Sequence, residues 1–418
     1  MELLRRVLLV VAAALALAPA AITQGTFPLK DGDRVVFYGD SITDQRLYTT
    51  FVETFVVTRF PRLKVWFVHS GVGGDRVTGG WAGPIDLRLR RDVIAYKPTV
   101  MTIMLGMNDA SYRGWDDAIF KTYSTGYQHI IDTMKQAVPG IRITVIQPSP
   151  YDDATRPPNI ADGYNAVLIR YGQFVKELGE REHLVVADLN SPVVTMLEKA
   201  KAADPELAKK IIEDRIHPGP GGQLIMAEAL LRAWNAPATV AAVEIDAAAK
   251  RVARADNAKV TDLQAGSSLT WTETDSALPM PVDLNDDVLA LSVRCSDFIE
   301  ALDQEPLKIT GLAAERYVLK IEGEKVGDFT KERLQEGINL ATLNTPMAKQ
   351  AATVHDLTRK HNDIHFARWR DVQVALQDYK FAAEPSAVDA LDKLEDQVVQ
   401  RQRAAAQPKP RRYELAPE

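Results

Sequence analysis

The first half of the chain alternates short apolar runs with helical stretches, and this alternation is the feature that most restricts the fold. Buried strands are predicted where β-branched and aromatic residues cluster, at 34–38, 64–68, 99–105, 141–146 and 184–187. Helices are predicted between and after them, at 47–60, 87–96, 116–137, 162–182 and 223–234. Strand followed by helix with short connections predicts one parallel sheet covered by helices on both faces.

Three of the predicted strands lead into glycine-containing polar blocks. These blocks are Gly-Asp-Ser-Ile at 39–42, Gly-Gly-Asp at 73–75 and Gly-Met-Asn-Asp at 106–109. The carboxyl ends of parallel strands form the ligand crevice of an open α/β sheet, so the three blocks are expected to converge. A fourth block, Asp-Arg-Ile-His-Pro at 214–218, precedes the last helix. Alone it also suits a loop in which Asp214 binds backbone amides and caps the helix near Gln223.

In this order the four blocks resemble the SGNH (GDSL-type) hydrolase superfamily of esterases and lipases. The resemblance implies a flavodoxin-like, three-layer α/β domain with a five-stranded parallel sheet, ending near residue 237. It implies that Ser41 is the nucleophile, that His217 is the base and that Asp214 orients the base. It also implies that the oxyanion hole consists of the Ser41 N–H, Gly74 and Asn108.

The second block departs from the family pattern. It reads His-Ser-Gly-Val-Gly-Gly-Asp at 69–75, where family members often carry Asn before the first glycine. Two adjacent glycines leave the oxyanion donor open between Gly73 and Gly74. Gly74 is favoured because it precedes Asp75, as in the family pattern.

The residue types suit acyl transfer. A serine hydroxyl is a poor nucleophile at neutral pH, so a neighbouring imidazole has to accept its proton. The three-residue spacing lets a turn stiffened by Pro218 and Pro220 bring the Asp214 carboxylate to Nδ1 of His217, which leaves Nε2 facing Ser41. Backbone and amide N–H groups then stabilise the developing oxyanion. No Gly-x-Ser-x-Gly occurs in the chain, which argues against the nucleophile elbow of the α/β-hydrolases.

A metal site is the main chemical alternative at these blocks. The acidic side chains that suggest it are Asp40, Asp44, Asp75 and Asp109. A histidine–carboxylate metal site needs more converging ligands than one histidine offers, so we expect no metal and no cofactor. His69 and His129 are predicted to be structural.

The N-terminus has the pattern of a secretory signal peptide at 1–20. A basic start at 1–6 is followed by an apolar run at 7–18 and an Ala-Pro-Ala cleavage site. The run is shorter than the roughly 20 residues that span a bilayer, which disfavours an uncleaved anchor. We therefore expect a secreted or periplasmic protein with no stable membrane span after cleavage. Cys295 is the only cysteine, and its place in the alternating run at 288–295 favours a buried, small apolar role over a reactive thiol.

The 418 residues, 46% hydrophobic and 25% charged, allow two domains. The predicted organisation is a catalytic domain at 26–237, a β-rich accessory domain at 238–345, a helical extension at 346–406 and a disordered tail at 407–418. Strands of the accessory domain are predicted at 243–246, 268–272, 289–293, 307–310 and 317–321, with a hairpin turn at Gly323. Packing against the catalytic domain is favoured for this region over a substrate wall or a glycan-binding surface.

The formal net charge of −6 shows no excess of basic residues that would attract nucleic acid, so no nucleic-acid partner is expected. The signal peptide and the resemblance together imply a secreted carboxylic-ester hydrolase that removes small acyl groups, above all acetyl, from a small-molecule or polysaccharide ester. One alternative is a lysophospholipase or thioesterase of the same superfamily, which needs an apolar groove. Another is a non-catalytic glycan-binding protein. The sequence predicts neither the acyl length nor the oligomeric state.

Overall fold

The predicted parallel sheet forms the centre of the catalytic domain. The computed structural model describes residues 26–418, so the predicted signal peptide at 1–20 lies outside the described residues. The strands follow the order β2-β1-β5-β6-β7 with every pairing parallel. Their bounds are β1 (Arg34–Gly39), β2 (Trp66–Gly71), β5 (Val100–Met104), β6 (Arg142–Ile146) and β7 (Val185–Ala187). This is the flavodoxin-like order, which confirms the predicted fold class.

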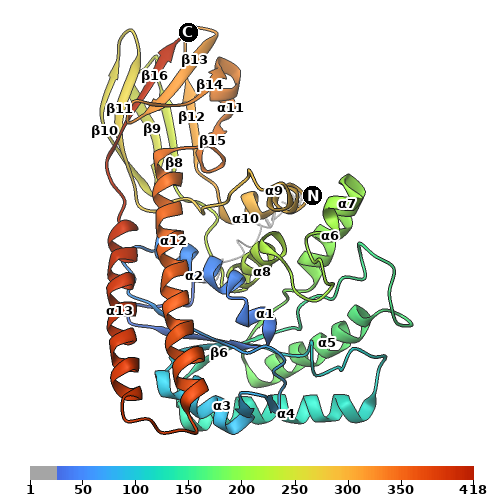
Figure 1. The fold of residues 1–418 in the computed structure, drawn as a ribbon. Coiled ribbons are helices and arrows are strands. Elements are labelled where there is room, and N and C mark those ends of the chain that lie inside the picture. Colours follow the sequence, from blue (N-terminus) through green and yellow to red (C-terminus); the bar gives the residue numbers. More distant parts are fainter. Residues whose placement is uncertain (1–25) are drawn as a thin grey trace, which may run out of the picture.

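Helices cover both faces of this sheet, so β5 is buried along its whole length. One face is covered by α2 (Leu47–Arg59) and α8 (Pro220–Ala233), and the other by α3 (Ile85–Asp92), α4 (Asp117–Ala137) and α5 (Tyr164–Glu182) (Figure 1). Two further helices, α6 (Ser191–Ala203) and α7 (Pro205–Ala208), were not predicted from the sequence. Shorter elements are α1 (Ser41–Asp44), β3 (Gly79–Gly80), β4 (Gly83–Pro84) and η1 (Ile94–Tyr96).

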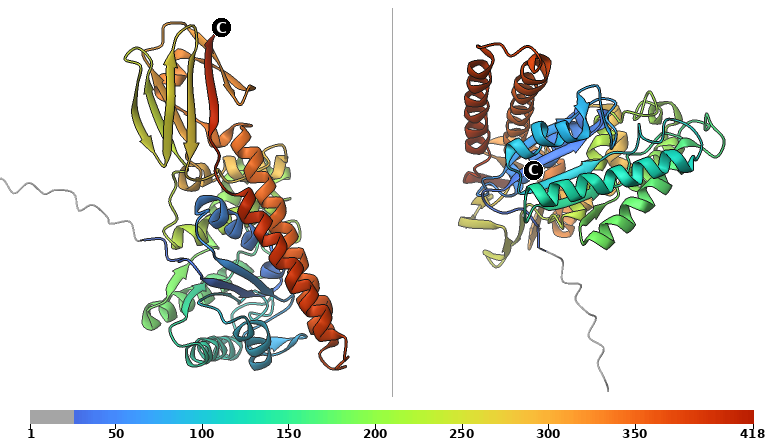
Figure 2. Two further views of the ribbon diagram at one scale, coloured as in Figure 1. Left: turned by 90° about the vertical axis from the view of Figure 1, so that its left-hand side faces the viewer. Right: turned by 90° about the horizontal axis from the view of Figure 1, so that it is seen from below.

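The accessory region forms a lobe of two sheets that share one apolar core, to which Trp271, Ile309 and Leu319 belong (Figure 2). The first sheet orders β10 (Ala258–Ala265), β11 (Leu269–Asp275), β16 (Arg411–Pro417), β13 (Arg316–Ile321) and β14 (Glu324–Thr330). The second orders β15 (Ile338–Asn339), β12 (Pro306–Thr310), β8 (Ala242–Asp246) and β9 (Arg251–Asp256). The lobe also contains α11 (Lys331–Glu336) and η2 (Leu340–Thr342). The hairpin predicted at Gly323 joins β13 to β14.

The prediction of a disordered tail at 407–418 is wrong. Strand β16 lies between β11 and β13 and pairs with both. Tyr413 and Leu415 are fully buried, and the Tyr413 ring stacks on Trp271 at 4.9 Å between centroids. The charged and proline-rich composition around 407–412 hid this short period-2 pattern, so the last strand of the chain completes the β lobe.

The strand predicted at 289–293 is also wrong, because this run forms α9 (Asp287–Arg294). Asp286 caps the helix by accepting hydrogen bonds from the N–H groups of Val288 and Leu289. With α10 (Phe298–Leu302), this helix packs against α8 and joins the core of the catalytic domain. Cys295 is buried as expected, but at the end of a helix.

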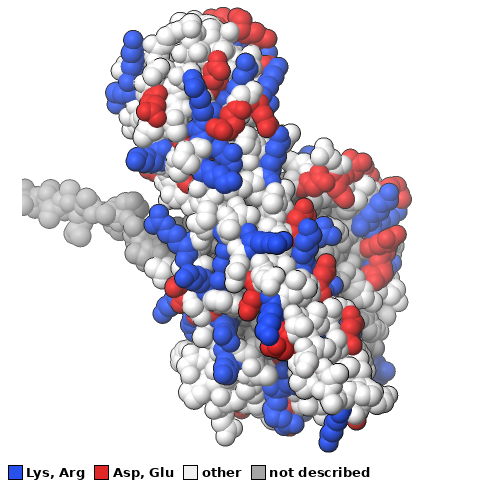
Figure 3. Space-filling model, turned by 60° about the vertical axis from the view of Figure 1, so that its left-hand side comes forward, with Lys and Arg blue, Asp and Glu red and all other residues white. Residues whose placement is uncertain are grey.

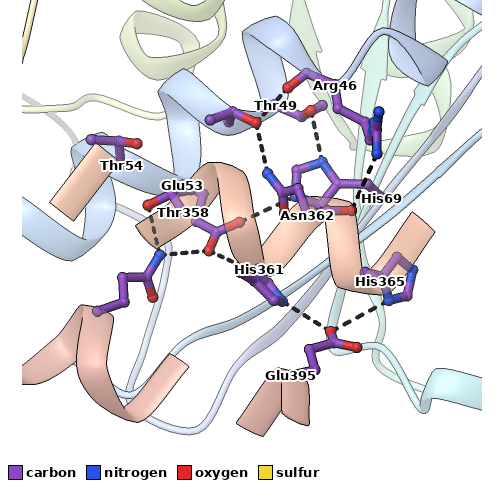
Figure 4. Close-up of polar contacts among 12 residues, drawn as sticks. Arg46, Thr49, Glu53, Thr54, His69, Thr358, His361, Asn362, His365 and Glu395 are labelled. Carbon is purple, nitrogen blue, oxygen red and sulfur yellow. Dashed lines mark hydrogen bonds and ion pairs between the residues drawn. The ribbon is translucent and has the colours of Figure 1, made fainter. Parts of the chain in front are cut away.

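The helical extension runs along one side of the catalytic domain as an antiparallel pair (Figure 2). It consists of α12 (Pro346–Phe366), the π-helical segment η3 (Ala367–Val374) and α13 (Glu384–Ala405). Its centre is tied to the catalytic domain through Glu53 of α2 (Figure 4). That carboxylate pairs with His69 Nε2 of β2 at 3.1 Å and His361 Nδ1 of α12 at 2.9 Å, and it accepts from Gln402 of α13 at 2.8 Å. His361 Nε2 pairs in turn with Glu395 at 2.9 Å.

The surface carries interspersed charges, with acidic and basic side chains alternating on the face drawn in Figure 3. Over residues 26–418, the structure contains no helix with both the length and the apolar character of a membrane span.

Candidate active site

Ser41 lies at the turn from β1 into α1. The preceding Asp40 accepts a hydrogen bond from the Ile42 N–H at 3.0 Å, which starts the helical turn with Ser41 as its first residue. The turn is tight, because a Cβ added at Gly39 would lie 2.2 Å from Thr43 Oγ1 and 2.7 Å from the Met104 carbonyl oxygen. Glycine at this position therefore allows β1 to present the serine at the edge of the sheet.

The structure brings the predicted nucleophile, base and orienting acid together. Ser41 Oγ lies 2.8 Å from His217 Nε2, and His217 Nδ1 lies 2.6 Å from Asp214 Oδ2. The second Asp214 oxygen accepts from the backbone N–H groups of Ile216 and His217 at 2.9 and 2.8 Å. The N-cap of α8 is Gly219, which has no side chain, and Asp214 does not cap that helix. The loop thus presents the imidazole to the serine in the orientation required of a general base.

The electrostatics favour an ionised Asp214. Partial burial opposes ionisation, but the hydrogen bonds from the His217 side chain and from two backbone N–H groups outweigh it and lower the pKa of Asp214 below its usual value. The side chains of His217 and Asp214 are 34% and 52% exposed, so the site is open to solvent. The structure also contains a large cleft between α2, α12 and residues 280–289. Ser41, Asp214 and His217 do not line this cleft.

The geometry distinguishes between the two candidate glycines. The Gly73 N–H donates to Asp44 Oδ2 at 3.0 Å and is therefore occupied. The Gly74 N–H has no acceptor among the described residues, and the φ of +80° at Gly74 suits glycine. Of the two glycines, Gly74 is therefore the one with an available N–H, and its role as oxyanion donor stays a prediction.

Asn108 is held beside this block. Its Nδ2 donates to the Asp75 carbonyl oxygen at 3.1 Å, and its Oδ1 accepts from the Tyr112 hydroxyl at 3.0 Å. These two contacts fix the amide plane and leave the second N–H of Nδ2 available to a substrate oxygen. The sequence offered no signal for Tyr112.

The acidic side chains near the site each have their own structural partner and do not converge on one point where a metal ion could bind. Buried Asp75 pairs with Arg88 Nε at 2.8 Å, and buried Asp109 accepts from the Val77 N–H at 2.9 Å. Burial raises the pKa of both Asp40 and Asp109 to about 7. Over the described residues, no three His, Cys, Asp or Glu side chains form a group suited to a metal ion.

Comparison with known proteins finds a family model that matches the part of the chain that contains this site. Residues 37–225 match the model of the GDSL-like Lipase/Acylhydrolase family. An acetylxylan esterase of Geobacillus stearothermophilus is 26% identical over 223 residues, which make up 48% of this chain and 93% of that protein. A crystal structure of an acetylxylan esterase from the same organism is 24% identical over 49% of this chain and 95% of its own, with a TM-score of 0.39. The structure of a gut microbial diltiazem-metabolizing enzyme is 25% identical, with a TM-score of 0.81 over 94% of this chain and 99% of its own. The likeness to this last enzyme therefore extends over the β lobe and the helical extension.

Proposed function

Because residues 37–225 belong to the GDSL-like lipase/acylhydrolase family, we propose that the protein hydrolyses carboxylic esters through an acyl-Ser41 intermediate. The observation that carries the proposal is the continuous chain of hydrogen bonds from Ser41 Oγ through His217 to Asp214. A glycan-binding protein without activity has no need of this alignment.

In the first half of the reaction, Ser41 Oγ attacks the acyl carbon while its proton passes to His217 Nε2. The carbonyl oxygen becomes an oxyanion that accepts from the N–H groups of Ser41, Gly74 and Asn108. When the tetrahedral intermediate collapses, the bond to the alcohol oxygen breaks and His217 returns the proton to that oxygen. In the second half, His217 accepts a proton from water as the water oxygen attacks the acyl group. The bond between the acyl carbon and Ser41 Oγ then breaks, His217 returns the proton to Ser41 Oγ, and the carboxylic acid leaves.

We propose further that the acyl group is small, with acetyl esters of carbohydrates as the leading substrates. The open site, with half of the Asp214 side chain exposed, suits a bulky and hydrated alcohol better than a fatty chain. The exposed ring of Tyr112, next to Asn108, offers an apolar face to a sugar. The relative named as an acetylxylan esterase supports the same substrate class. We also propose export to the periplasm or the medium, which N-terminal sequencing of the mature protein tests: it should begin near Ala21.

The test is a substrate panel with a matched serine control. Wild-type protein, Ser41→Ala and Ser124→Ala are each assayed for hydrolysis. The substrates are nitrophenyl esters from acetyl to long chain, acetylated xylan, pectin and diltiazem. Ser124 lies on the exposed face of α4 and donates only to the Lys121 carbonyl oxygen. Hydrolysis and fluorophosphonate labelling should vanish only in Ser41→Ala.

Preference for long-chain esters would favour the lysophospholipase or thioesterase alternative. Binding of acetylated xylan by wild-type protein without hydrolysis would favour the glycan-binding alternative. Labelling of Ser41→Ala at another serine would show that the nucleophile is assigned wrongly.

A further inference from the structure

Both backbone polar groups of Gly73, which lies next to the nucleophile, are held by side chains. The Gly73 N–H donates to Asp44 Oδ2 at 3.0 Å, and the Gly73 carbonyl oxygen accepts from the indole Nε1 of Trp81 at 2.9 Å. A Cβ added at Gly73 would lie 3.9 Å from Ser41 Cβ, so this residue borders the site. Trp81 is 62% exposed, so its ring is not part of the hydrophobic core. Its indole N–H nevertheless makes a hydrogen bond at the border of the site.

The Gly73 carbonyl belongs to the same planar peptide unit as the Gly74 N–H. The described residues contain no cis peptide bond, so this C=O and this N–H point in opposite directions. A hydrogen bond that fixes the carbonyl on the Trp81 side therefore fixes the direction of the N–H on the other side. Since Gly74 has a φ of +80° and no side chain, contacts of this peptide unit are the main restraint on that direction.

The two side chains that hold Gly73, Trp81 and Asp44, are both contacted by one residue of the helical extension. The Arg370 guanidinium of η3 lies 4.1 Å above the centre of the Trp81 ring and 3.5 Å from Asp44 Oδ2. Its side chain is 16% exposed, so the cation is partly withdrawn from water and its contacts are strengthened. Next to it, buried Trp369 donates to Asp92 at 2.7 Å and anchors η3 to the catalytic domain.

We propose that Arg370 and Trp81 are positioning residues that aim the Gly74 N–H at the oxyanion. The inference rests on the proposed ester hydrolysis and gives the helical extension a part in it. Arg370 holds Trp81, which sets the orientation of the Gly73–Gly74 peptide, and Asp44, which fixes the preceding peptide through the Gly73 N–H. The extension is therefore a component of the active site in addition to a packing element.

The chain provides a matched control for docking alone. Arg403 of α13 lies 4.1 Å above the ring of Trp66, the same distance as in the Arg370–Trp81 pair. This second pair also joins the extension to the catalytic domain. However, Trp66 begins β2, at the strand end opposite to Gly71 and the site.

The experiment compares Trp81→Phe, Arg370→Ala and Arg370→Lys with Trp66→Phe and Arg403→Ala in the full-length protein. Trp81→Phe keeps a ring for Arg370 but removes the indole donor. Loss of a whole oxyanion donor costs about 10²–10³ in kcat, so a misaimed donor should cost about 10-fold or more with KM almost unchanged. We expect this loss in Trp81→Phe and Arg370→Ala, and a smaller loss in Arg370→Lys, which keeps the charge beside Asp44 but not the planar stack.

A second readout separates positioning from a structural effect. A boronic acid forms a tetrahedral adduct with the serine, so its inhibition constant should weaken by about the same factor as kcat. The control variants should keep wild-type kcat and inhibition, and thermal melting identifies any variant that is not folded.

Three results would overturn the positioning role even if wild-type protein hydrolyses esters. They are an unchanged kcat in Trp81→Phe, a rise in KM alone in that variant, and equal losses of kcat in the Arg403 and Arg370 variants. If wild-type protein cleaves no ester and its Ser41 is not labelled, the proposed function fails first and the positioning role with it.

Discussion

Replacing Glu53 by Gln tests how the helical extension is held. Glu53 and His361 are 1% and 2% exposed, and the carboxylate also contacts His69 and Gln402 (Figure 4). Gln has the same shape and keeps one acceptor oxygen, but it removes the negative charge opposite His361. The substitution therefore isolates the electrostatic part of the contact between α2 and α12.

The expected cost follows from burial. Removing one partner of a buried ion pair destabilises a protein by about 3–5 kcal/mol, because the remaining charge stays buried without compensation. Glu395 still faces His361, and the Gln oxygen still accepts a hydrogen bond, so we expect the lower end, about 3 kcal/mol. With a urea m-value of about 3 kcal/mol/M, the unfolding midpoint should fall by about 1 M.

The cost should also depend on pH. Burial opposes protonation of His361, but Glu53 and Glu395 outweigh it and raise the pKa of His361 to about 10. A histidine with a raised pKa contributes stability fully below its unfolded value of about 6.5 and loses the contribution as the pH rises through about 10. His361 and His69 likewise outweigh the burial of Glu53 and lower its pKa to about 2, so its contribution is present above about 4.5 and is lost as the pH falls through about 2. The cost of Glu53→Gln should thus be largest near pH 5–6.5 and shrink toward pH 9.5.

Urea unfolding at pH 6 and pH 9.5 measures both effects. Asp389→Asn is the matched control, because it removes a carboxylate of α13 that pairs only with exposed Lys393. A cost of Glu53→Gln no larger than that of the control, or one that is equal at the two pH values, would refute the reasoning.

Four further results are expected at the site and in the β lobe. Asn108→Ala should lower kcat by about 10²–10³ with a smaller change in KM, and an unchanged kcat in steady-state assays would remove the residue from the oxyanion hole. Asp214→Asn should keep the fold by circular dichroism yet depress kcat, by less than the about 10⁴ seen in a serine-protease triad if backbone contacts still hold His217. Chelators should leave activity intact; activity lost with chelator and restored by a divalent ion would refute the serine mechanism. Leu415→Ala should cost about 2–5 kcal/mol in urea unfolding, because this side chain of β16 is fully buried, whereas no loss would mean that the strand is not docked.

Local patterns predicted the catalytic domain well, because its strands and helices are long and regular. The run before Ser41 is a buried strand, and the blocks at 73–75 and 106–109 follow strands of the same sheet, so a parallel topology brings them together. The same reasoning failed at 289–293, where apolar residues fit both a period of 2 and a helix. The packing of α9 against α8 and the N-terminal cap from Asp286 favour the helix over the strand.

The sequence by itself therefore determined the flavodoxin-like sheet and the order of the four blocks, since these depend on propensity and periodicity within a few residues. Only the tertiary structure decided the central place of β16, the occupation of the Gly73 N–H by Asp44, the Glu53–His361 contact and the approach of Arg370 to Trp81. Each of these joins side chains or strands that are distant in the chain, or depends on which backbone N–H already has an acceptor. Such pairings leave no local pattern, because a residue's partner is set by how whole elements pack and not by its neighbours in the sequence.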